Sequence, residues 1–431
     1  MKHLAILTLC LTLFSCTSET KQKTEERIPV TTPDAVGFSI DSLKKIETIV
    51  NEYVDKKAIP GATILIARNG KILYEKAFGY DDITTQTPMR TDHIFRVASM
   101  TKPIVSAAAL QLYEEGKLKP DDKLSQYIPE FANVRVLDSF DRQDTTWTTK
   151  PADREITIHD LLTHTSGISY GFTNPTYGAI YGKLGIPDAA HPYDFTIMDM
   201  AKKMATAPLV HQPGEKWTYG LSTDILGAVI EVVSGKSLGE YVHENILNPL
   251  QLNHSGFWLP DSLADDLATF YMPDQEKGIV KIPEEGIGMF RPDFPVNGAR
   301  KYYSGGSGLS MTARDYFVFS QAILNGGIYD GTRILKEETV ELMRTNQIPD
   351  ISARLPFGFG YGYGIATKDS NDFRDIRKGK FSWGGAFNTT FWIDPVRDLV
   401  VVIMSQVVSN PEKNVIDSRL EAAVNSAFIN Q

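Results

Sequence analysis

Cysteine is almost absent from this chain of 431 residues, which has two, Cys10 and Cys16, both near the N-terminus. The remaining sequence therefore has no disulfide bond and no thiol chemistry of its own. The net charge of −9 is spread along the chain without a basic stripe, which argues against nucleic acid as a partner. With 42% hydrophobic and 23% charged residues, the composition is that of a folded globular protein.

Motifs of several other enzyme classes are also missing. The G-x-S-x-G motif that a hydrolase of the Ser-His-Asp type carries at its nucleophile does not occur, and SGGSGL at 304–309 has the wrong spacing. Among the eight histidines no H-E-x-x-H is found, and no glycine-rich loop suits a phosphate. We therefore expect no metal site and no cofactor.

The N-terminal residues have the form of an export signal. Residues 1–15 combine a cationic start with an apolar core that is too short to span a membrane. The sequence Leu13-Phe14-Ser15-Cys16 resembles a bacterial lipobox, so we expect lipidation at Cys16 and a tether over residues 16–36. This predicts a bacterial membrane-anchored lipoprotein, periplasmic or on the cell surface, and a plain signal peptide with an incidental cysteine is the alternative.

Residues 95–116 contain the main candidate for a nucleophile. Their apolar positions recur every three to four residues and Gly116 is a natural stop, which predicts a helix buried on one side. Ser99 and Lys102 are three residues apart at its start, so their side chains project from one face. A neighbouring amine can take the proton of a serine hydroxyl, but an isolated S-x-x-K is more often a capping serine with a solvated lysine. Pro103 removes one backbone donor, which predicts a loosened first turn. The apolar positions are Ile104, Val105, Ala108, Ala109, Leu112 and Tyr113.

The remaining patterns indicate an α/β (α+β) protein with a helical insertion. Two strands flank Asn69-Gly70, a strong hairpin signal, and further strands are expected in 361–365, 380–395 and 398–406. Amphipathic helices at 41–56 and 412–428 predict a sheet with one face covered by both chain ends. We expect residues 37–117 and 296–431 to form this α/β domain. Residues 118–295 predict an inserted helical domain, with helices at 158–162, 196–205 and 224–234 and loops at 145–154, 169–191 and 274–297.

Two further segments offer residue types suited to a site. Tyr219 precedes the helix expected from residue 224, and its phenol could fill the core or, beside a cation, pass a proton to a leaving group. In the sequence SWGGA at 382–386, Gly384 and Gly385 allow another chain or a ligand to approach the backbone closely.

In this order and spacing, the motifs resemble those of the serine β-lactamase and penicillin-binding-protein superfamily. The class C β-lactamase-like branch, which includes the family VIII carboxylesterases, is the most similar. The resemblance implies the β-lactamase-like fold, an antiparallel sheet flanked by helices with an inserted all-helical domain. It also implies Ser99 as nucleophile, Lys102 and Tyr219 as general base and acid, and an oxyanion hole made by the backbone N–H groups of Ser99 and Ala386. The matching motifs are Ser99-x-x-Lys102, Tyr219-Gly220-Leu221 and Trp383-Gly384-Gly385, with further matches at 161–168, 212–231, 304–315 and 391–395.

Two positions depart from the β-lactamase pattern. Leu221 stands where asparagine is usual, and Trp383 stands where lysine or histidine would meet a substrate carboxylate. Trp-Gly-Gly resembles the esterase branch, so we expect an exported serine hydrolase that cleaves carboxylic esters through an acyl-enzyme on Ser99. The expected partner is a small-molecule ester or amide substrate, contacted by Trp383, Gly384, Gly385 and Leu221. The alternatives are a D-amino-acid peptidase or β-lactamase acting on cell-wall-type substrates, and a non-catalytic binding lipoprotein of the same fold.

Overall fold

A large antiparallel sheet forms the centre of the protein, whose computed structural model describes residues 28–188, 191–370 and 372–429. The strand order is β12-β13-β14-β15-β16-β1-β2-β3. At the predicted hairpin, Asn69 and Gly70 have φ values of 53° and 71°, as a two-residue turn with left-handed backbone requires. The strands are β1 (Gly61–Arg68), β2 (Lys71–Asp82), β3 (Thr87–Pro88), β12 (Gly358–Phe359), β13 (Gly364–Ile365), β14 (Phe381–Gly385), β15 (Thr389–Asp394) and β16 (Leu399–Met404).

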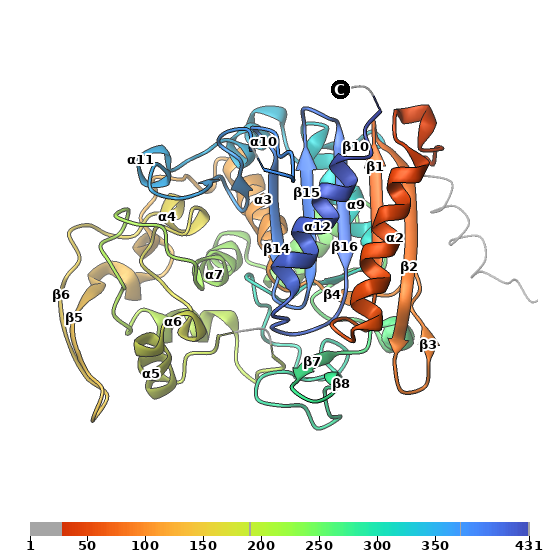
Figure 1. The fold of residues 1–431 in the computed structure, drawn as a ribbon. Coiled ribbons are helices and arrows are strands. Elements are labelled where there is room, and N and C mark those ends of the chain that lie inside the picture. The colour runs from red at the N-terminus through yellow and green to blue at the C-terminus, as the bar shows by residue number, and fades with distance from the viewer. Residues whose placement is uncertain (1–27, 189–190, 371, 430–431) are drawn as a thin grey trace, which may run out of the picture.

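Two helices from opposite ends of the chain cover one face of this sheet. α2 (Ile40–Asp55) and α12 (Lys413–Asn425) pack side by side there, in red and dark blue in Figure 1. The alternation of side chains along β1 explains the packing, because Ile64 and Ile66 join the core beneath these helices whereas Leu65 joins the core on the other face. The predicted sheet with flanking helices is confirmed.

The helix that carries the predicted lysine is more deeply buried than its pattern indicated. α3 (Thr101–Glu114) has eleven of its fourteen residues buried, because it lies in the core between the sheet and α7 (Ser222–Ser234). The prediction of a single buried face was therefore too narrow. Tyr113, which we expected on that face, is 36% exposed.

The predicted helix over residues 95–116 was also too long at its start. Phe95 and Arg96 form β4 and pair with β9 (Ser310–Met311), and residues 98–100 form a 3-10 turn. Long-range bonds explain the difference, because the Val97 N–H donates to the carbonyl of Leu309 at 3.0 Å and holds this segment away from helical geometry. The loosened turn is therefore the 3-10 turn at 98–100, and Pro103, at which it was expected, lies within α3.

Residues 118–295 are not purely helical. Helices were expected at 158–162, 196–205 and 224–234, and α4 (Ile158–Leu162), α6 (Ile197–Met204) and α7 occupy these places. The segment also contains two hairpins that were expected as loops or helices, formed by β5 (Arg135–Asp141) with β6 (Thr146–Pro151) and by β7 (Tyr271–Asp274) with β8 (Gly278–Lys281). The segment also contains α5 (Pro175–Leu184) and α8 (Leu238–Val242). After residue 295 and before β12 follow α9 (Ala313–Leu324), β10 (Ile328–Tyr329), β11 (Thr332–Arg333), α10 (Glu337–Arg344) and α11 (Pro349–Ser352).

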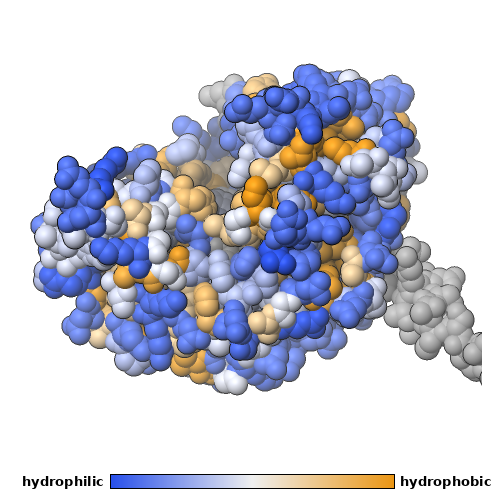
Figure 2. Space-filling model, turned by 90° about the horizontal axis from the view of Figure 1, so that it is seen from below, coloured by the Kyte–Doolittle hydropathy of each residue, from blue (hydrophilic) through white to orange (hydrophobic). Residues whose placement is uncertain are grey.

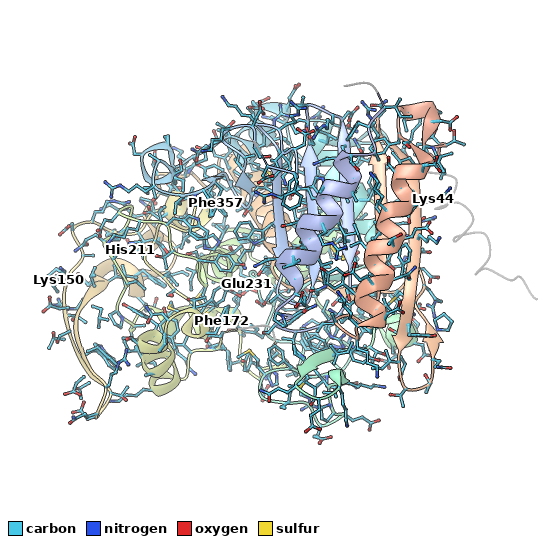
Figure 3. The ribbon with its side chains drawn as sticks, in the orientation of Figure 1. Lys44, Lys150, Phe172, His211, Glu231 and Phe357 are labelled. Atoms are coloured by element: carbon cyan, nitrogen blue, oxygen red, sulfur yellow. The ribbon has the colours of Figure 1, made fainter. Side chains whose placement is uncertain are left out.

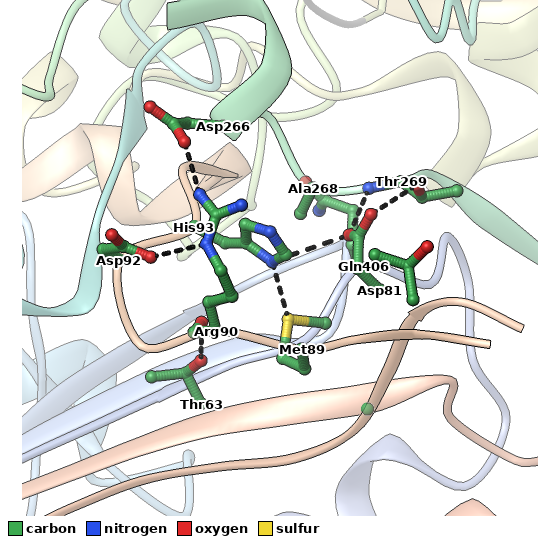
Figure 4. Close-up of polar contacts among 12 residues, drawn as sticks. Thr63, Asp81, Met89, Arg90, Asp92, His93, Asp266, Ala268, Thr269 and Gln406 are labelled. Carbon is green, nitrogen blue, oxygen red and sulfur yellow. Dashed lines mark hydrogen bonds and ion pairs between the residues drawn. The ribbon is translucent and has the colours of Figure 1, made fainter. Parts of the chain in front are cut away.

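Polar contacts fasten the segment around residue 266 to the connection between β2 and β4. Arg90 donates to Asp92 at 2.8 Å and also pairs with Asp266, as Figure 4 shows. Thr269 donates to Asp81 through its N–H and its hydroxyl, both at 2.9 Å. These bonds lie just before β4, the strand that leads to the turn carrying Ser99. None of the helices in the described ranges is long and apolar enough to cross a membrane.

Candidate active site

Ser99 lies in the 3-10 turn Ala98–Met100, directly before α3. Ala98 has a φ of 47°, in the left-handed region that a residue with a side chain seldom adopts, so the turn is held by its surroundings. β14 supplies part of this support, because a side chain at Gly385 would come within 2.4 Å of the Val97 carbonyl oxygen. The expectation that a glycine here permits close approach of another backbone is confirmed.

Lys102 reaches back toward Ser99 from the first turn of α3. Its side chain is 1% exposed, and its Nζ lies 3.1 Å from Ser99 Oγ, 3.1 Å from the Tyr170 hydroxyl and 2.8 Å from the Gly306 carbonyl oxygen. Three acceptors match the three donors of an ammonium group. Lys102 is therefore fixed in position beside the serine and is not the solvated lysine of the alternative interpretation.

Tyr219 is the second side chain, after Lys102, that contacts Ser99 Oγ. Its hydroxyl donates to Ser99 Oγ at 2.6 Å and accepts a long hydrogen bond of 3.4 Å from Trp383 Nε1. Lys102 Nζ lies 4.6 Å from the centre of the Tyr219 ring, a cation–π distance. The structure thus brings together Ser99, Lys102, Tyr219 and Trp383, which are up to 284 residues apart in sequence.

Tyr170 belongs to the same group, although the sequence did not single it out. Burial raises the pKa of Tyr170 well above its usual value, so its hydroxyl stays protonated beside Lys102. Tyr219 and Tyr170 therefore differ in role, since Tyr219 contacts the serine oxygen and Tyr170 contacts the amine. The signal available was position, because Tyr170 follows the 161–168 motif by two residues.

Two further buried groups surround the site. His164 is 1% exposed, and burial together with the charge of Lys102 holds the pKa of its imidazole well below the usual value, so it is neutral. Its ring centre lies 5.1 Å from that of Tyr219. Asp224 is fully buried and accepts from Ser304 Oγ at 2.7 Å. Burial raises the pKa of Asp224, and the Ser304 hydroxyl and Lys102 act in the opposite direction.

The remaining predicted site residues fall into two groups. Ala386 is exposed and follows Gly385 at the end of β14, beside the Ser99 turn, and Gly384 lies in the same strand with room limited by Thr390. Leu221 is 1% exposed and packs in the core, which leaves its backbone alone to contact a substrate. Cys16 and the predicted signal segment lie outside the described residues.

Aromatic side chains form the surroundings of Tyr219 on the side of the third motif. Trp383 and Trp217 have ring centres 5.5 and 6.0 Å from that of Tyr219, and Phe357 contacts Trp217 edge-on at 5.2 Å. Phe357 is labelled in Figure 3. Aromatic walls of this kind suit an uncharged ligand. Figure 2 shows several apolar patches among hydrophilic residues on the face seen from below.

A metal site is not apparent among the described residues. In the ranges that the structure covers, no cluster of three or more His, Cys, Asp or Glu side chains is placed to hold a metal ion. The polar side chains that contact Ser99 Oγ are the Tyr219 hydroxyl and the Lys102 amine.

Comparison with known proteins gives a family model and several relatives that cover most of the chain. A family model described as Beta-lactamase matches residues 46–426. Esterase EstB of Burkholderia gladioli is 30% identical over an alignment of 387 positions that covers 86% of this chain and 93% of EstB. A putative D-alanyl-D-alanine carboxypeptidase of Escherichia coli (strain K12) is 29% identical, over 89% of this chain and 87% of the relative. The solved structure of EstCE1, described as a hydrolase with promiscuous acyltransferase activity, has a TM-score of 0.75 and 28% identity, covering 90% of this chain and all of EstCE1.

Proposed function

This chain belongs to the beta-lactamase family, and on that premise we propose that it is an exported serine hydrolase that cleaves carboxylic esters through an acyl-enzyme on Ser99. The observation that carries the proposal is the convergence on Ser99 Oγ of the Tyr219 hydroxyl at 2.6 Å and Lys102 Nζ at 3.1 Å. A nucleophile with its proton acceptor within hydrogen-bonding distance is what covalent catalysis requires.

In the proposed reaction the Lys102–Tyr219 pair holds one proton fewer than an ammonium and a phenol together, so one member is a base. Ser99 Oγ forms a bond to the ester carbonyl carbon as its proton passes to that base. The backbone N–H groups of Ser99 and Ala386 stabilise the negative carbonyl oxygen of the tetrahedral intermediate. The bond to the leaving alkoxide then breaks, and Tyr219 supplies the proton that makes it an alcohol. Water attacks the acyl-enzyme, gives up a proton to the same pair, and releases the carboxylic acid and Ser99.

The preference for esters rests on Trp383. An indole offers a large apolar face and one N–H, and that N–H is directed at the Tyr219 hydroxyl. A substrate carboxylate would find no cation at this position of the third motif. The likeness to Esterase EstB and EstCE1 supports the same choice.

Acyl transfer to an alcohol is a second candidate, favoured by the likeness to EstCE1. The acyl-enzyme is common to both reactions, and they differ in whether water or an alcohol attacks it. Cleavage of D-alanyl-D-alanine peptides, which the carboxypeptidase relative suggests, is the alternative that Trp383 argues against.

The decisive experiment compares Ser99→Ala with wild type on p-nitrophenyl esters, nitrocefin and D-Ala-D-Ala peptides. We expect wild type to hydrolyse the esters fastest and Ser99→Ala to lose at least about a thousandfold in kcat. Ser262→Ala, at an exposed serine in the 3-10 helix Asp261–Asp266, is the matched control and should keep full activity. Product analysis with added butanol separates hydrolysis from transfer. A stable covalent adduct without turnover would instead indicate a binding lipoprotein.

A further inference from the structure

Phe172 presents its aromatic ring to solvent. A single residue, Tyr170, lies between it and Lys102. Phe172 is 64% exposed, and its ring stacks on that of Tyr170 with centres 4.7 Å apart and an angle of 26°. The Tyr170 hydroxyl in turn lies 3.1 Å from Lys102 Nζ. Single exposed apolar residues are common on protein surfaces. Phe172 differs because its partner ring belongs to the site.

The turn that carries Phe172 is firmly held. Residues 171–173 form a 3-10 turn in which the Gly171 N–H donates to Asp188 Oδ1 at 2.6 Å and Thr173 Oγ1 donates to the Tyr170 carbonyl at 2.9 Å. Any side chain at Gly171 would lie 2.6 Å from the Asp188 carboxylate, so glycine allows this contact. The phenyl ring is therefore presented by a fixed backbone, and binding to it requires little additional ordering.

The ring also ends a chain of aromatic contacts that reaches the site. The Tyr219 ring centre lies 5.3 Å from that of Tyr170 and 5.5 Å from that of Trp383, so ring contacts run from Trp383 through Tyr219 and the buried Tyr170 to Phe172. Figure 3 shows Phe172 low in the molecule and Phe357, near the Trp383 end, above it. An ester placed at Ser99 has two groups, acyl and alcohol, and a group that extends past Tyr170 would meet the exposed ring of Phe172.

We propose that Phe172 determines specificity by binding an uncharged apolar group of the ester against its exposed face. The proposal rests on the proposed ester hydrolysis and adds to it a substrate class, esters with an alkyl or aryl group of several carbon atoms. Each buried methylene favours binding by roughly fourfold, so chain length is the property to vary.

The test measures kcat/KM for wild type, Phe172→Ala and Phe172→Leu on two series of esters. The acyl series is p-nitrophenyl acetate, butyrate and hexanoate, and the alcohol series is ethyl, butyl and hexyl acetate. In one of the two series, we expect the ratio of kcat/KM for the longest ester to kcat/KM for the shortest to fall by roughly tenfold in Phe172→Ala, mainly through KM. The ratio should fall by less in Phe172→Leu. Phe373→Ala removes a phenyl group that is 70% exposed in a different loop, so it is the matched control and should leave both ratios unchanged.

The series that responds identifies the group bound, acyl or alcohol. Ratios in Phe172→Ala that match those in Phe373→Ala would overturn the proposal while leaving ester hydrolysis intact. An equal loss of kcat on every ester, short ones included, would also overturn it, because Phe172 would then act by positioning Tyr170. Failure of wild type to cleave any ester would refute the proposed function, and this inference with it.

Discussion

Replacing Tyr219 with phenylalanine removes one hydroxyl and leaves the ring. The hydroxyl donates to Ser99 Oγ at 2.6 Å and accepts from Trp383 Nε1 at 3.4 Å, whereas the ring keeps its packing against Tyr170 and Trp383. No apolar contact is lost, but both hydrogen bonds are, and the one from Trp383 is long. We therefore expect the free energy of unfolding to fall by about 1 to 2 kcal/mol, since one hydrogen bond is usually worth about 1 kcal/mol.

The effect on the reaction should be much larger than the effect on stability. A positioned general acid or base contributes about 10² to 10⁴ in rate, which corresponds to roughly 3 to 5 kcal/mol of transition-state stabilisation. Lys102 Nζ lies 3.1 Å from Ser99 Oγ and in its neutral form can still accept the serine proton, so activity should not vanish. We expect kcat for a p-nitrophenyl ester to fall by about a thousandfold.

Tyr170→Phe is the matched control for this variant. It also removes one phenol hydroxyl from the site, but that hydroxyl contacts Lys102 at 3.1 Å and makes no bond to Ser99. The expected loss in kcat is about tenfold, because the missing bond affects only the position of the amine. Initial rates of p-nitrophenol release and thermal unfolding of both variants measure the two effects. If Tyr170→Phe lost as much activity as Tyr219→Phe, the assignment of proton transfer to Tyr219 would be refuted.

Four other predictions follow from the same geometry. Lys102→Ala should also reduce kcat by orders of magnitude, and combined with Tyr219→Phe it should cost less than the product of the single losses; multiplicative losses would contradict a shared proton pathway. Trp383→Lys should raise the ratio of nitrocefin to neutral-ester kcat/KM by about tenfold or more through a charge-assisted contact, and an unchanged ratio would place selectivity elsewhere. Cys16→Ser should move the protein from the membrane to the soluble fraction of fractionated cells, and a wild type found only in the soluble fraction would exclude the anchor. Asp160→Asn should lower the free energy of unfolding in urea by about 2 kcal/mol, since the carboxylate is 1% exposed and paired with a half-exposed arginine. Although burial opposes ionisation, hydrogen bonds from Arg154 and Thr157 hold the Asp160 pKa below the usual value of an aspartate, about 4. This stabilisation is therefore present above about pH 4 and is lost as the pH falls through the pKa of the folded state.

The sequence predicted the sheet and the central group of residues because both have local signals. The hairpin at Asn69 and Gly70 follows from turn chemistry, and α2 and α12 follow from their amphipathic patterns. Ser99 and Lys102 are neighbours on one helix turn. Tyr219 and Trp383 were found because their motifs follow Ser99-x-x-Lys102 in the order known from the superfamily. Their spacing in the sequence alone does not show that they lie close to Ser99.

The partners of Lys102 could not be predicted because they come from distant segments. Tyr170 is 68 residues away and Gly306 is 204 residues away, yet each contacts the same amine. Both belong to or adjoin motif segments, at 161–168 and 304–315, that were matched without a role for any single residue. The structure explains why those segments are needed, since they enclose the amine.

Local propensity failed where tertiary bonds decide the conformation. The pattern of residues 95–116 suits a helix throughout, but pairing of β4 with β9 keeps Phe95 and Arg96 extended. The β5–β6 hairpin was missed because its second strand, TWTTKP, has too few apolar residues to show the alternation that marks a strand. Its threonines have high strand propensity, but that signal alone was too weak.

The position of Trp383 links substrate selectivity to proton transfer. Its indole N–H is directed at the Tyr219 hydroxyl, which itself donates to Ser99 Oγ, so the third motif belongs to the same hydrogen-bond chain as the nucleophile. A lysine at position 383 would add a second cation near Lys102 and lose this orienting donor. Trp383→Lys should therefore lower kcat for every substrate while it shifts the preference toward anionic ones. Selectivity must accordingly be measured as a ratio of kcat/KM values, since total activity reports on Tyr219 as well as on the substrate contact.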